Sequence, residues 1–86
     1  MNEYVEHLWI DVFDGDRITL GWEVLPEFEG NEKKEACHVG EILAKAIGRE
    51  IGAAFKDDEE MAVKIAARLS YTILGEISEA LENAEN

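Results

Sequence analysis

Glu35 and His38 stand three residues apart in a segment with helical periodicity. That spacing places both side chains on one face of a helix, as the metal centres of carboxylate-rich helical bundles require. Such a centre also needs carboxylates from other helices, and residues 62–74 contain none. A second copy of the chain would have to complete the ligand set. The alternative hypothesis is therefore a metal-binding or enzymatic homodimer centred on Glu35 and His38, with His7 as a further candidate. In the main hypothesis we expect no cofactor.

The other reactive side chains do not combine into a catalytic pattern. Cys37 and His38 are adjacent, so on a helix they point about 100° apart and do not form a nucleophile–base pair. Cys37 is expected to be a small buried hydrophobic residue. Asp11, Asp14 and Asp16 crowd one turn, but the ligand rhythm of a twelve-residue calcium loop is missing. We therefore expect a solvated turn at residues 14–16. For the protein as a whole, we expect a binding protein rather than an enzyme.

Acidic residues give the chain a net charge of −12, and they are unevenly distributed. Residues 1–30 carry eight acids and one base, residues 57–86 carry eight acids and two bases, and residues 31–56 carry four acids and five bases. This charge disfavours direct binding to nucleic acid or to an anionic membrane and favours a basic protein partner. Acidity also promotes solubility, so the charge alone does not establish a function.

The predicted contact surface combines carboxylates with aromatic anchors. Acids near the end of the last helix oppose the helix dipole, and a sequence selected for stability alone would carry lysines there. The predicted partner-binding residues are Trp9, Asp11, Phe13, Asp14, Asp16, Glu23, Asp57, Asp58, Glu59, Glu60, Glu76, Glu79 and Glu82. The hypothesis is an interaction module that acts as an inhibitor or nucleic-acid mimic on a basic, nucleic-acid-binding protein. A purely structural oligomer is a second alternative.

Alternating apolar residues predict a β-hairpin across residues 4–25, with a turn at residues 14–16. A two-residue loop would mix the two faces, whereas a longer loop puts the even-numbered apolar residues on one face. That register pairs Leu8 with Trp22, Ile10 with Leu20 and Val12 with Ile18. The opposite face then pairs His7 with Glu23, Trp9 with Gly21 and Phe13 with Arg17.

Two helices are expected to follow, at about residues 32–55 and 59–83, with Asn31 capping the first and Asp57 or Asp58 the second. Small residues recur every fourth position along the first helix, at Ala36, Gly40, Ala44, Gly48 and Gly52. Glycine inside a helix costs about 1 kcal/mol relative to alanine. The regular spacing therefore predicts a neighbour at very close range, which is the second helix, the sheet or a second copy of the chain.

The fold class predicted is α+β, a single domain over residues 1–86 in which an antiparallel hairpin precedes two helices (ββαα). The apolar band of the last helix is wider than one hairpin and one helix need, which predicts a homodimer with an extended sheet or a helix bundle. Gly40, Ala44, Gly48, Gly52 and Leu74 are assigned to the dimer or to close helix packing. The first helix is expected to form a buried middle with the acids outside it.

The chain has one cysteine, no apolar stretch near 18 residues and no basic, apolar leader at its start. These features predict a cytoplasmic protein without a transmembrane helix.

Overall fold

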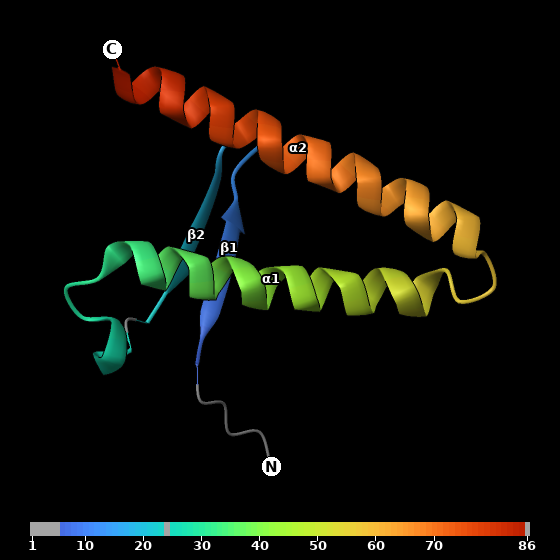
Figure 1. Cartoon of the computed structure of the whole chain (residues 1–86), viewed down its shortest axis with the longest axis horizontal. Coiled ribbons are helices and arrows are strands. Elements are labelled where there is room, and N and C mark those ends of the chain that lie inside the picture. The colour runs from blue at the N-terminus through green and yellow to red at the C-terminus, as the bar shows by residue number, and fades with distance from the viewer. Residues whose placement is uncertain (1–5, 24, 86) are drawn as a thin grey trace. The chain divides into compact units, whose positions relative to one another are not determined.

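A computed structural model describes residues 6–23 and 25–85, without the side chain of Glu85. The elements are β1 (Leu8–Val12), β2 (Ile18–Trp22), the 3-10 turn η1 (Pro26–Phe28), α1 (Glu32–Ala54) and α2 (Glu59–Glu85) (Figure 1). The ββαα order and the α+β class predicted from the sequence are confirmed. The chain divides into two compact units, Met1–Gly40 and Glu41–Asn86, and α1 contributes to both.

The hairpin has the predicted register. Leu8 pairs with Trp22, Ile10 with Leu20 and Val12 with Ile18 in an antiparallel ladder. Phe13 N–H donates to the carbonyl of Arg17 at 2.9 Å, which closes a three-residue loop at residues 14–16. The strands are shorter than predicted, since β2 ends at Trp22. Tyr4 and Val24, which the alternation placed in the strands, lie outside the described residues.

The turn is held by the carboxylate of Asp14. Its Oδ1 accepts the backbone N–H groups of Asp16 and Arg17, both at 3.1 Å, and its Oδ2 accepts Arg17 Nε at 2.9 Å. The Arg17 guanidinium, followed by the two backbone N–H groups, holds the pKa of Asp14 below its ordinary value of 3.8. The stabilisation is therefore present above pH 3.8 and is lost as the pH falls through the lowered pKa.

Trp9 occupies the face of the hairpin that Gly21 leaves bare. The two residues are paired across the strands, and a Cβ atom added at Gly21 would overlap the indole ring of Trp9. Arg17 lies 5.7 Å from the centroid of the Phe13 ring on the same face. Both contacts follow from the predicted register, because that register sets these residues directly opposite one another.

Both helices begin at the predicted caps. Asn31 Oδ1 accepts the N–H of Lys34 at 3.3 Å, and Asp58 Oδ1 accepts the N–H of Met61 at 3.1 Å. Gly30 precedes the first cap with φ 78°, a left-handed conformation that favours glycine. These caps satisfy backbone donors that an isolated helix would leave without partners.

The described residues contain very little core. Val39 in α1 is the only buried hydrophobic residue among them, with 4% of its surface exposed. The prediction that the first helix forms a buried middle is therefore wrong for a single copy of the chain. Cys37 is exposed, contrary to its predicted burial. The reason is helical geometry, since positions 37 and 39 point about 200° apart and Cys37 lies on the opposite side of α1 from Val39.

Candidate functional site

The hairpin carries three of the predicted contact acids at its surface. Asp11, Asp16 and Glu23 are exposed, and Glu23 Oε1 lies 3.7 Å from His7 Nδ1, in agreement with their predicted pairing. Asp14 is occupied by the turn that it stabilises. The aromatic anchors Trp9 and Phe13 are also exposed. The structure thus places the predicted hairpin residues together on one unit of the chain.

A second group of predicted acids lies around the turn between α1 and α2. Asp57, Asp58, Glu59 and Glu60 are all exposed. Asp58 caps α2, and Glu60 Oε1 lies 3.6 Å from Lys64 Nζ one helical turn away. Two of these four carboxylates therefore have a local structural role, and the other two form no ion pair among the described residues.

The third group stands on the C-terminal half of α2. Glu76, Glu79 and Glu82 are exposed, as is every residue from 71 to 84. Residues 76–86 include no lysine or arginine. Within the described part of the chain, Glu76 and Glu79 form no ion pair. This half-helix is therefore an exposed surface with glutamates and without a basic residue.

His38 pairs with a residue that sequence reasoning missed. His38 Nε2 lies 2.8 and 2.9 Å from the two carboxylate oxygens of Glu6, and the two side chains are only 31% and 21% exposed. The ring of Phe28 packs on His38 with centroids 4.8 Å apart. A signal was present, because Glu6 occupies an even-numbered position in an otherwise apolar run.

The other member of the predicted Glu35–His38 spacing has different surroundings. Its Oε2 atom is buried and has no hydrogen-bond partner among the described residues. The described ranges contain no group of three or more His, Cys, Asp or Glu side chains that could hold a metal ion. In a single chain, the partner of His38 is therefore Glu6 and not Glu35.

Replacing Glu6 with alanine is expected to lower the free energy of unfolding by about 1–2 kcal/mol, because a half-buried His38 loses its charge-assisted hydrogen bonds. Glu23→Ala is the matched control, since it also removes one carboxylate from a histidine but at an exposed site. Its expected effect is below about 0.5 kcal/mol. Urea denaturation of both variants measures the difference, and equal effects would show that the Glu6–His38 pair has no special structural role.

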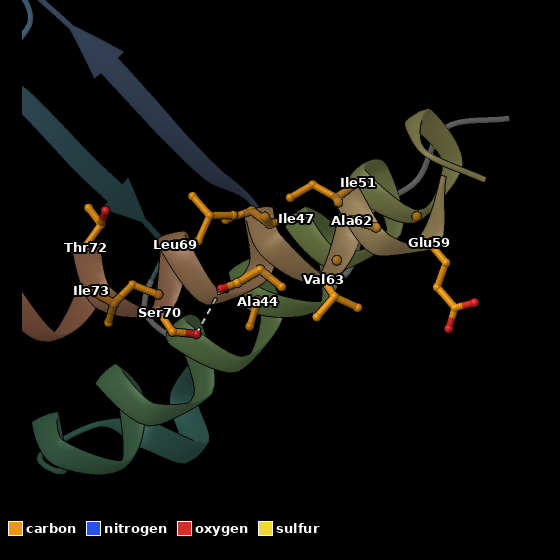
Figure 2. A pocket seen from close by; sticks show the side chains of 13 residues that line it. Ala44, Ile47, Ile51, Glu59, Ala62, Val63, Leu69, Ser70, Thr72 and Ile73 are labelled. Atoms are coloured by element: carbon orange, nitrogen blue, oxygen red, sulfur yellow. Dashed lines mark hydrogen bonds between the residues drawn. The ribbon is translucent and has the colours of Figure 1, made fainter. Parts of the chain in front are cut away.

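An apolar groove of about 470 Å³ lies between the later turns of α1 and the first half of α2 (Figure 2). It lies within one unit of the chain. Helix α1 lines it with Ala44, Ile47, Gly48, Ile51 and Gly52. Helix α2 lines it with eight residues between Glu59 and Ile73, among them Ala62, Val63, Ala66, Leu69 and Ser70.

The groove offers almost no polar group to a ligand. Ser70 Oγ donates to the carbonyl of Ala66 at 3.1 Å, and Thr72 Oγ1 donates to the carbonyl of Arg68 at 3.2 Å. Glu59 stands at one end, and Figure 2 shows its carboxylate directed away from the apolar side chains. Sites for small molecules combine an apolar lining with a few convergent polar groups that orient the ligand. This groove lacks them and is suited to an apolar protein surface.

Three members of the small-residue row of α1 line this groove, at Ala44, Gly48 and Gly52. A Cβ atom added at Gly48 or Gly52 would meet nothing within 4 Å, and the same holds for Gly40 outside the groove. Within this unit of the chain, α2 is therefore not the close neighbour that the spacing predicted at Gly48 and Gly52. Leu74 was assigned to the same contact, and it is 59% exposed.

Comparison with protein-family models, with curated protein sequences and with solved structures finds no match to this chain. Over the ranges that the structure describes, neither α1 nor α2 combines the length and the apolar character needed to cross a membrane.

Proposed function

We propose that this chain is a protein-interaction module that presents carboxylates to a basic protein, as an inhibitor or nucleic-acid mimic. The observation that carries the proposal is the C-terminal half of α2, where Glu76, Glu79 and Glu82 stand on a fully exposed helical segment without a lysine or arginine. The exposed acids of the hairpin supply a second negative surface with Trp9 and Phe13 beside it.

The placement of these glutamates is unfavourable for the isolated helix. A carboxylate in the last turn of a helix, as at Glu82, opposes the dipole at a cost of about 0.3–1 kcal/mol. Like charges three residues apart repel one another by about 0.2–0.5 kcal/mol for each pair. A basic partner would neutralise that charge and remove the cost. The spacing also suits mimicry, because glutamates three residues apart rise by about 4.5 Å each. One strand of duplex DNA carries a phosphate about every 3.4 Å of helix axis. The half-helix therefore approaches the linear charge density of a single nucleic-acid strand.

The double variant Glu76→Gln, Glu79→Gln is expected to be more stable than the parent chain by about 0.2–0.5 kcal/mol, because the repulsion between two like charges three residues apart on α2 is removed. The same variant is expected to bind a polyarginine peptide several-fold more weakly at low salt, since charges at an interface rim set the electrostatic attraction. Thermal unfolding measures the first effect and fluorescence titration of labelled peptide the second.

Glu41→Gln, Glu50→Gln is the matched control, because it removes the same charge from exposed positions of α1 that are not among the predicted contact residues. Peptide binding that weakens equally in both double variants would contradict the assignment to α2. If the peptide is not retained by the parent chain even at low salt, the proposed function is wrong. A bound nucleic-acid-binding protein should further release DNA when the chain is added, as competition for one basic surface requires.

A further inference from the structure

Helix α2 consists of two unlike halves. Eight residues between Glu59 and Ile73 line the groove with α1, and Ala62 and Leu69 are half-buried there. Residues 74–84 do not line the groove, and their apolar side chains Leu74, Ile77 and Leu81 are between 50% and 64% exposed. We propose that the groove is filled by the C-terminal half of α2 from a second copy of the chain, with the two α2 helices antiparallel about a two-fold axis. This inference does not depend on the proposed basic partner.

The pattern of side-chain sizes along α2 selects the antiparallel arrangement. One stripe follows the alternating three- and four-residue spacing of a coiled-coil seam, at Val63, Ala66, Ser70, Ile73, Ile77 and Ala80. The helix spans 27 residues, Glu59–Glu85, so a full overlap of two antiparallel copies centres near Tyr71 and Thr72. A two-fold axis between these two residues seats every member of the stripe opposite another member.

Each pair formed in this way joins a branched aliphatic residue to a small one. Val63 meets Ala80 of the second copy, Ala66 meets Ile77, and Ser70 meets Ile73. Close packing without voids needs such alternation of large and small residues across an interface. A parallel pair would instead set each residue against itself, with isoleucine crowded on isoleucine and alanine facing alanine across a gap.

The groove wall contributed by α1 admits a helix at close range. Ala44, Gly48 and Gly52 line it, and the added Cβ atoms at the two glycines would meet nothing. Glycine lowers helix stability by about 1 kcal/mol relative to alanine, so these positions are costly in a single chain. A helix packed against the bare backbone accounts for both the glycines and the empty space in front of them.

Charge complementarity favours the same orientation. Residues 61–75 carry Lys64 and Arg68 and no acid, whereas residues 76–86 carry four glutamates and no base. Antiparallel helices place Lys64 and Arg68 of each copy alongside the glutamate-rich half of the other. Parallel helices would align eight glutamates within about one Debye length of each other, which is about 8–10 Å at physiological salt. A two-fold axis uses the groove and the exposed half-helix of both copies at once, so that each contact is made twice.

Cysteine cross-linking tests the orientation. Val63→Cys and Ala80→Cys are made separately on a Cys37→Ser background and mixed before mild oxidation. We expect the mixed 63–80 disulfide to form at least about tenfold faster than either homodisulfide, because the proposed contact holds these positions at a high effective concentration. Two copies of position 63 would lie about 25 Å apart, which is beyond the reach of a disulfide.

Other outcomes overturn the proposal. A rapid 63–63 disulfide would establish parallel helices. Equal, slow formation of all three species, at the rate of an outward-facing Glu79→Cys control, would show that α2 does not pair and that the hairpin of the same chain or nothing covers the groove. Circular dichroism verifies that each variant is helical. If Val63→Cys fails to fold, the pair Ala66→Cys with Ile77→Cys tests the same register.

Discussion

Replacing Ile77 with glutamate is expected to weaken the association of two chains at least about a hundredfold. In the proposed assembly this side chain enters the groove of the second copy opposite Ala66. Lys64 and Arg68 stand two residues to either side of Ala66 and point about 200° away from it on the helix. Burying an unpaired carboxylate costs several kcal/mol, and each 1.4 kcal/mol is a tenfold change in a dissociation constant. Sedimentation velocity over a concentration series measures the shift. Ile77 is 50% exposed in a single chain. If two chains do not pair through α2, the substitution would therefore have little effect on the sedimentation of the protein.

Ser78→Glu is the matched control for this variant. It adds the same charge at the next position of α2, which points about 100° away from Ile77 on the helix. Its dissociation constant should stay within several-fold of the parent value. A similar loss of association in both variants would mean that the added negative charge, and not the burial of position 77, causes the effect.

Gly48→Ala is expected to change the stability of a single chain and that of the proposed dimer in opposite directions. In a single chain the added methyl group meets nothing, and alanine should stabilise α1 by up to about 1 kcal/mol. In the proposed assembly the methyl group enters a closely packed interface, where overpacking costs about 1–3 kcal/mol. We therefore expect Gly48→Ala to weaken the dimer and to lower the midpoint of thermal unfolding at micromolar concentration.

Gly75→Ala supplies the comparison within α2. A Cβ atom at Gly75 also meets nothing within 4 Å, but this residue does not line the groove and lies off the proposed seam. Alanine should raise the unfolding midpoint there in either arrangement. If Gly48→Ala and Gly75→Ala stabilise the protein equally, no second helix packs against the small-residue row of α1.

The proposed dimer and the proposed basic partner respond to salt in opposite ways, so the failure of one can be told from the failure of the other. Salt screens the attraction between the glutamates of α2 and a basic surface. It equally screens the repulsion between two chains that each carry a charge of −12. The apolar contact should therefore persist at salt concentrations that release the basic partner.

Local features of this protein were predictable from its sequence. The alternation of apolar residues defined the hairpin register, because a slip of one position would send Ile10 and Leu20 to the opposite face. Asn31 and Asp58 marked the starts of the helices, since their side chains replace missing backbone acceptors. These features depend on neighbours within a few residues.

Features that depend on tertiary burial were not predictable in the same way. The Glu6–His38 pair joins residues 32 positions apart, and only the interruption of an apolar run by Glu6 pointed to it. Cys37 was expected inside because cysteine is commonly buried, yet α1 buries Val39 alone among the described residues. Periodicity predicts an apolar face on α2, but it does not say whether the same chain or another covers that face.

The mass of the protein in solution tests the shared groove most directly. Light scattering at micromolar concentration and physiological salt should give twice the chain mass of 9.7 kDa. It should give a lower mass for Ile77→Glu and the parent mass for Ser78→Glu. A mass near 9.7 kDa for the parent chain, with intact helicity by circular dichroism, would contradict the proposal that a second copy fills the groove.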